Sequence, residues 1–256
     1  MSTAPRIAYL GDGTLPGPAS YLAGIMTHCG LEHVHVPTAE PPGESVFEPE
    51  VGLYVLSDYP AANFDRARMD RLCQRVADGS GVLMLGGWKS YHGQGGDYDQ
   101  TPLADLLPVR MLSEDDRRNW AQLILVRAQV AHRITAGLPL DRPPSIGGYN
   151  ELEPAPGATV VLRGERYRLE CGGDGIELSL DGEFPLLVLS EPAPGPKGAG
   201  HRACFATDVA PHWVGGLVDW GDARVTVSVA GSSIEVGNHY VQLFRNLLVW
   251  CLGMDL

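Results

Sequence analysis

The sequence predicts an α/β fold: a mostly parallel sheet flanked by helices, with β-rich extensions toward the C-terminus. Three observations predict it. Continuously apolar segments at residues 6–11, 52–57 and 82–86 are typical of strands buried on both faces. Amphipathic stretches at 18–29 and 63–79 have the length expected of right-handed crossovers between parallel strands. The second half of the chain is rich in short strand-like segments separated by Gly and Pro turns.

Each element of the first half has a local signal. Pro18 suits the first turn of a helix that Gly30 ends, and "LEHVHVPT" at 31–38 indicates a second strand. Asn63 is expected to cap a second helix, which Gly79 ends. We expect the three apolar strands to be central and parallel, so that their C-terminal ends share one edge of the sheet.

The strand-like segments beyond residue 108 form either a separate domain or an extension of the same sheet. We favour an extension, and a single domain over 1–256, because the chain returns to a helix near its end. Asn238 is expected to cap that helix. Segments 163–182 and 221–237 are interpreted as possible β-hairpin insertions. The apolar stripe of the last helix consists of Tyr240, Leu243, Phe244, Leu247, Leu248 and Cys251.

Composition excludes several classes of function. The net charge is −12 and Lys and Arg do not cluster, which argues against a nucleic-acid surface. Five widely spaced cysteines contain no C-x-x-C pair, so we assign no metal and expect reduced thiols in a cytoplasmic protein. Gly11-x-Gly13 lacks the third glycine of a dinucleotide fingerprint, and no cofactor is expected. No signal core or membrane-spanning apolar run is present in the sequence.

The loop after the third apolar strand, in "GVLMLGGWKSYHGQGGDY" (81–98), is where many α/β enzymes carry a nucleophile. Here Gly86, Gly87 and Trp88 leave the strand, and Ser90 stands in no G-x-S-x-G frame. The glycines either only permit a tight turn or bring backbone amides to a pocket roofed by Trp88 and Tyr91.

Polar residues follow the predicted strands and should converge on one edge of the sheet. Two histidines and up to three aspartates there could bind a divalent metal or act as an acid/base pair. Alternatively, the first two aspartates cap loops and the second histidine packs on Trp213. These residues are Asp12, Asp58, His92, Asp208 and His212.

The run "LMLGGWKSYHGQGGDYDQTPLADLLPV" resembles a bacterial family of class I glutamine amidotransferase-like proteins, related to the trehalose-utilisation ThuA-like proteins. Further motifs resemble the same family in the same order: "AHRITAGLP", "GYNELEP", "FPLLVL", "HRACFATDVAPHW" and "LFRNLLVWCLG". The similarity covers most of the chain, and segments 163–182 and 221–237 fit it less well. The resemblance implies a flavodoxin-like α/β domain.

Active members of the amidotransferase class use a Cys on the strand-to-helix elbow and a His-x-Glu pair after a late strand. The elbow position falls on Gly86-Gly87-Trp88, and Val214 stands two residues after His212, so the resemblance implies that the Cys-His-Glu triad is missing. The remaining cysteines are expected in the core or at helix and strand positions without activation. We therefore predict that glutaminase activity is absent.

Three hypotheses of function remain. The first is a domain that binds a small polar ligand, such as a sugar or an amide, in one cleft at the C-terminal edge of the sheet. The second is a hydrolase that uses His212 and Asp208, with or without a metal. The third is a homo-oligomeric assembly protein whose β-rich insertions pair with other subunits. The residues expected to bind the ligand are Gly86, Gly87, Trp88, His92, Asp58, Asp208 and His212.

Overall fold

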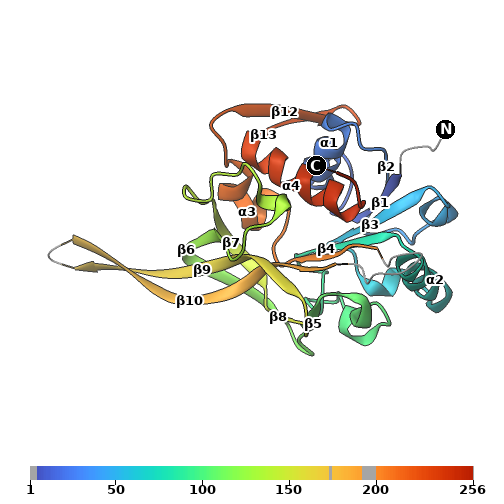
Figure 1. Ribbon diagram of the computed structural model, residues 1–256, viewed down its shortest axis with the longest axis horizontal. Coiled ribbons are helices and arrows are strands. Elements are labelled where there is room, and N and C mark those ends of the chain that lie inside the picture. The colour runs from blue at the N-terminus through green and yellow to red at the C-terminus, as the bar shows by residue number, and fades with distance from the viewer. Residues whose placement is uncertain (1–4, 173–174, 192–199, 256) are drawn as a thin grey trace.

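The computed structural model describes residues 5–172, 175–191 and 200–255. Its centre is a nine-stranded mixed sheet (Figure 1) in the order β2-β1-β3-β4-β11-β10-β9-β6-β7. The first five strands are parallel: β2 (His33–Val36), β1 (Arg6–Gly11), β3 (Val51–Ser57), β4 (Gly81–Leu85) and β11 (Arg202–Phe205). The other four are antiparallel to their neighbours: β10 (Gly175–Ser190), β9 (Thr159–Gly172), β6 (Arg117–Ala128) and β7 (Ser145–Asn150). The predicted fold class is confirmed.

The parallel half of the sheet is buried on both faces. Every residue of β4 is buried, and Leu10, Leu56 and Met84 are side by side in register across β1, β3 and β4. Helix α1 (Ala19–His28) leads from β1 to one side of it, and α2 (Arg66–Ala77) leads from β3 to the other side. Right-handed crossovers in opposite directions put these helices on opposite faces. In Figure 1, α4 (Asn238–Cys251) lies with α1.

Two helix starts differ from the sequence prediction. Residues 61–63 form a short 3₁₀ turn, so α2 begins later, and Asp65 rather than Asn63 caps it by accepting a hydrogen bond from the Arg68 amide (2.8 Å). Asn238 is the first residue of α4 and does not cap it, because its Oδ1 accepts from the Ala223 amide (3.0 Å). Both asparagines bond to a different segment, which local sequence patterns do not reveal.

The second half of the chain adds strands β6, β7, β9 and β10 to the same sheet. Segment 163–182 lies in the long β9–β10 hairpin, whose residues 173–174 are outside the described part. Segment 221–237 contains the hairpin of β12 (Arg224–Val229) and β13 (Ser232–Gly237), which covers α1. The approach is close because Gly24 of α1 has no side chain: a Cβ there would lie 2.9 Å from Cγ2 of Val227.

The remaining elements support the sheet edge. Helix α3 (Pro211–Val218) packs on β7, where the Trp213 ring lies against Gly148 at a distance that no Cβ would allow. β5 (Val109–Met111) and β8 (Leu152–Pro154) form a small antiparallel pair. Among the described residues, no helix has the length and apolar character needed to span a membrane. Short 3₁₀ turns are η1 (Glu44–Phe47), η2 (Ala61–Asn63), η3 (Tyr98–Gln100), η4 (Ala104–Leu106) and η5 (Arg133–Thr135).

Candidate functional site

The C-terminal ends of the parallel strands carry the candidate site. Asp12 directly follows β1, Asp58 directly follows β3, and Asp208 comes three residues after β11. Asp12 and Asp58 have left-handed backbones, with φ of 52° and 47°. Aspartate tolerates this conformation better than most residues, and it turns the chain off the sheet at the strand end. Because these strands are parallel neighbours, all three carboxylates lie at one edge.

Asp12 is the deepest of the three carboxyl groups, at 4% exposure. Its oxygens accept hydrogen bonds from the Tyr9 hydroxyl and from Oγ of Ser57 (3.0 Å). Burial raises the pKa of Asp12 well above its usual range, and the negative charge of Asp208 raises it further. Burial thus favours the protonated form of Asp12, and both of its oxygens are hydrogen-bonded within the protein.

Asp208 is also buried, at 6% exposure, but its partners are backbone amides rather than side chains. Its Oδ1 accepts from the amides of Val209 (2.5 Å) and Ala210 (3.1 Å). Burial raises the pKa of Asp208 to about 7, and the charge of Asp58 adds to the rise, while the two amides oppose it. A carboxyl group with this pKa can either donate or accept a proton at neutral pH.

The loop after β4 uses its backbone amides internally. The Gly86 amide donates to the Phe205 carbonyl (2.8 Å), and the Gly87 amide donates to Oδ1 of Asn150 (2.9 Å). The Lys89 amide donates to Oδ1 of Asp58 (2.7 Å). Gly87 has φ of +153°, and a Cβ there would collide with the Asp58 carboxylate. The glycines thus permit a close turn, and the Gly86 and Gly87 amides are already bonded within the protein.

A buried polar pair that the sequence reasoning missed holds this loop. Nδ2 of Asn150 donates to the Asp116 carboxylate (2.7 Å), which also accepts from the amides of His92 (3.0 Å) and Gly93 (3.2 Å). Asn150 and Asp116 are fully buried. In the sequence, Asn150 could have been found from its place in the motif "GYNELEP". No pattern marked Asp116.

Two exposed rings lie near the Asp58 carboxylate. Trp88 is 44% exposed, and its ring centroid is 6.1 Å from that of His212, which is exposed at the start of α3. The Arg117 guanidinium, another group the sequence did not mark, lies 4.4 Å from the Trp88 ring centroid. Burial raises the pKa of Asp58, while hydrogen bonds from the Lys89 and Trp88 amides, the Lys89 charge and the nearby His212 oppose the rise. The structure therefore brings Trp88, Asp58, Asp208 and His212 together. The ring contact of His212 is with Trp88 rather than Trp213.

His92 belongs to a different cluster. Its Nδ1 lies 2.8 Å from Oδ1 of Asp99, and ligand atoms of His92, Asp97 and Asp99 lie within 4.8 Å of one another, close enough to hold a cation. In the described part of the chain, no hydrogen bond or ring contact joins His92 to Trp88 or His212.

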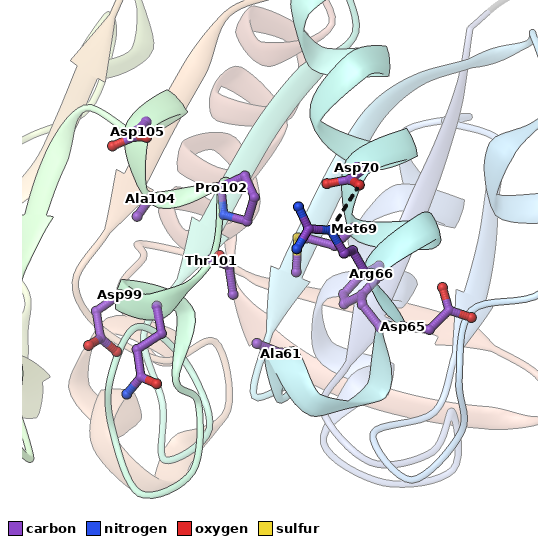
Figure 2. Close-up of a pocket in the computed structure, with 12 residues that line it drawn as sticks. Ala61, Asp65, Arg66, Met69, Asp70, Asp99, Thr101, Pro102, Ala104 and Asp105 are labelled. Carbon is purple, nitrogen blue, oxygen red and sulfur yellow. Dashed lines mark ion pairs between the residues drawn. The ribbon is translucent and has the colours of Figure 1, made fainter.

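Asp99 also lines a cavity of about 670 Å³ between the start of α2 and the 99–105 loop. Figure 2 shows its acidic lining, with Arg66 paired to Asp70 at 3.7 Å. Neither Trp88 nor His212 lines this cavity.

No cysteine stands at the end of β4. Cys204 and Cys251 are buried in β11 and α4, and burial raises the pKa of both thiols. Burial also raises the pKa of Cys73 to about 11 and raises that of Cys29. These four thiols stay protonated at neutral pH. Cys171 lies near the outer end of the β9–β10 hairpin and not at the C-terminal end of a parallel strand.

Several solved structures have a fold similar to that of this chain. No curated protein matches the chain. It is similar to the "Cytoplasmic Protein STM3548" of Salmonella typhimurium, with 21% identity, a TM-score of 0.70, and coverage of 96% of this chain and 98% of that one. It is similar to STM1381 of Salmonella typhimurium LT2 at 24% identity and a TM-score of 0.63, covering 81% and 90%. The "mmIFT52 N-terminal domain" shares 11% identity and a TM-score of 0.60, covering 98% and 99%.

These likenesses show the fold alone. The predicted relation to ThuA-like proteins stays a prediction. The family model GATase1_like, described as "Putative glutamine amidotransferase", matches residues 55–229. That span contains β4 with its glycine loop, the Asn150 motif, β11 and the segment that carries Asp208 and His212. The chain belongs to this glutamine amidotransferase-like family.

Proposed function

We propose that the protein binds a small polar ligand at the edge formed by Trp88, Asp58, Asp208 and His212, and that it does not hydrolyse glutamine. One observation carries the proposal: the exposed rings of Trp88 and His212, 6.1 Å apart, lie at the same edge as Asp58 and Asp208. Burial raises the pKa of both carboxyl groups. A few convergent polar groups with an aromatic wall are typical of ligand sites at the strand ends of α/β sheets.

The loss of glutaminase chemistry is supported by two separate features. The elbow position lacks a nucleophile, since Gly86, Gly87 and Trp88 follow β4. The amides of Gly86 and Gly87 donate to Phe205 and Asn150, so they are not free to stabilise an oxyanion. A cysteine introduced at residue 87 or 88 alone would therefore not restore the reaction.

The ligand's chemistry follows from the groups on offer. The Asp58 carboxylate, which is partly exposed, accepts hydrogen bonds, and the exposed face of Trp88 stacks on a flat amide or the apolar face of a sugar ring. His212 supplies a donor or an acceptor according to its tautomer. We expect a ligand rich in N–H or O–H groups, such as an amide or a sugar. The five free thiols suit a cytoplasmic, reducing location.

The test uses ligand-observed NMR to measure the binding of a panel of small amides, sugars and amines. We expect at least one class to bind the wild type and to lose about tenfold or more in affinity in Asp58→Asn and in His212→Ala. His92→Ala is the matched control, since its ring pairs with Asp99 instead. Equal binding by wild type and His212→Ala, or loss only in His92→Ala, would contradict the proposal.

A second candidate function is acid/base hydrolysis by Asp208 with His212. The observation that favours it is the pKa of Asp208, about 7, which matches a general acid or base at neutral pH. If it is correct, a hydrolysed panel member gives a rate that changes near pH 7 and vanishes in Asp208→Asn. Incubation with glutamine should release no ammonia. Release that stops when any one cysteine is replaced would show that a nucleophile had been misplaced.

A further inference from the structure

The outer part of the β9–β10 hairpin, residues 167–172 and 175–180, has two different faces, and we call it the arm. In its antiparallel ladder Ile176 is opposite Cys171, Leu178 is opposite Leu169, and Leu180 is opposite Tyr167. Residues directly opposite each other share a face, so these six side chains form one apolar face of the arm. The alternate pairs, Glu177 with Glu170 and Ser179 with Arg168, form a polar face.

The apolar face of the arm is exposed. The exposed fractions are 71% for Ile176, 52% for Leu180, 50% for Leu178 and 39% for Leu169. Figure 1 shows the arm extending well beyond the body of the molecule, where no other labelled element covers it. These four side chains present roughly 400 Å² of apolar surface, which is within the range of the largest patch on a typical monomer and is often functional.

We propose that this face binds the same face of a second copy of the chain, with the two arms antiparallel. One uniformly apolar face is self-complementary, as a twofold interface requires. Two such faces remove roughly 800 Å² of apolar surface from water, less than the about 1,200 Å² at which stable specific interfaces begin, so the association is weak and reversible. The dimer should therefore dissociate in the micromolar range.

Charge along the arm favours the antiparallel alignment. Arg166 and Arg168 lie at the base and share Asp181, which leaves a positive charge there. Glu170 and Glu177 lie toward the tip, and neither has an ion-pair partner among the described residues. These charges lie on the polar face and point away from the partner arm, so they act across the pair only weakly. They favour antiparallel arms, in which the acidic tip of each copy lies along the basic base of the other, over parallel arms, in which like charges lie side by side. The Leu169–Leu178 pair then lies near the twofold axis.

Sedimentation velocity of the full chain between about 1 and 100 μM tests the proposal. We expect a monomer–dimer equilibrium in the wild type, and a dimer weakened at least tenfold by Leu178→Glu. Ser179→Glu is the matched control: it adds the same charge one residue away, on the polar face, and should weaken the dimer far less than Leu178→Glu does. A wild type that is monomeric at 100 μM, or a dimer that Leu178→Glu leaves intact, would overturn the proposal.

A second measurement uses the unaltered chain, in case Leu178→Glu does not fold. Cys171 is the exposed one of the five cysteines and lies on the apolar face. Its alkylation rate per molecule should fall severalfold as the protein concentration rises from about 1 to 100 μM, as mass action occupies the interface. A rate that does not depend on concentration would mean that a second copy does not cover this face, and the self-association proposal then fails.

Discussion

β4 and the outer part of β10 both contain several large aliphatic residues, yet they differ completely in burial. "GVLML" of β4 is buried throughout, while "GIELSL" of β10 is exposed throughout. The first is continuously apolar and the second alternates apolar with polar. A parallel strand needs helical crossovers, which bring cover to both faces, whereas a hairpin needs only a turn and can extend past the body of the protein. Connection type, more than composition, decides burial here.

The same difference separates the two proposed surfaces. Parallel neighbours end together, so their loops bring Asp58, Asp208 and Trp88 to one edge. The antiparallel arm presents an extended apolar face and no convergence of loops. We therefore place small-molecule binding in the parallel half and protein association in the antiparallel half.

The largest expected effect comes from truncating one leucine in each half, which tests whether the two strands differ in their contribution to stability. Leu83→Ala in β4, where Leu83 is fully buried, should lower the free energy of unfolding by about 4 kcal/mol, because the core around it can relax only partly into the cavity. Leu178→Ala in the arm should change it by less than about 0.5 kcal/mol at concentrations where the chain is monomeric. Urea unfolding measures both. Similar losses would mean that the arm packs within its own chain.

The free energy of unfolding should depend on pH through the ionisation of Asp208. The pKa of Asp208 in the fold, about 7, lies above the usual value for an aspartate, so its stabilising effect is complete below about pH 4 and is lost as the pH rises through 7. Asp208→Asn cannot ionise. Relative to the wild type, it should gain about 3 kcal/mol of unfolding free energy between pH 4 and pH 8.

Asp115→Asn is the control of opposite sign. The side-chain bond to Arg117 lowers the pKa of Asp115 to about 2, so its contribution is present above the usual pKa and is lost in acid. This variant should be less stable than the wild type near neutral pH. Unfolding curves that run parallel for wild type and Asp208→Asn from pH 4 to 8 would show that Asp208 ionises normally.

The junction between the two halves depends on Asn150. Asn150→Ala removes the bonds to Asp116 and to Gly87 and leaves buried polar atoms without partners, so it should cost about 2 kcal/mol. Hydrogen exchange at the Gly87 and His92 amides should accelerate. Gln122→Ala, which removes a side-chain bond to the exposed Leu169 amide, should cost less than about 0.5 kcal/mol. Unchanged exchange at Gly87 would mean that Asn150 does not hold the loop.

The smallest expected effect is that of His212→Ala on stability. The side chain is exposed and its ring contact is with the exposed Trp88, so the free energy of unfolding should change by less than about 1 kcal/mol. Thermal unfolding checks this. A variant that unfolds would assign His212 a packing role and remove the reason to place it in a ligand site.

Local patterns were enough to predict the strands and crossovers of the parallel half. Continuous apolar runs specify β1, β3 and β4, and Gly30 ends α1 as expected, with φ of 69°. The absence of a nucleophile after β4 could also be read directly from Gly86-Gly87-Trp88. The polar strand ends followed from topology, since parallel neighbours must end on the same side. Each of these predictions depends only on a short segment of sequence or on the rule that neighbouring parallel strands end on the same side of the sheet.

Only the tertiary structure decided which of the polar groups meet. Asn150 bonds to Gly87 across 63 positions, and Arg117 reaches Trp88 from an antiparallel strand that no signal aligned with β4. The His92 ring pairs with Asp99 because the loop bends back on itself, and Asp65 replaces Asn63 as a cap because a 3₁₀ turn delays the helix. Such contacts depend on the relative placement of whole elements, and that placement is set by packing summed over the core rather than by the residues that finally touch.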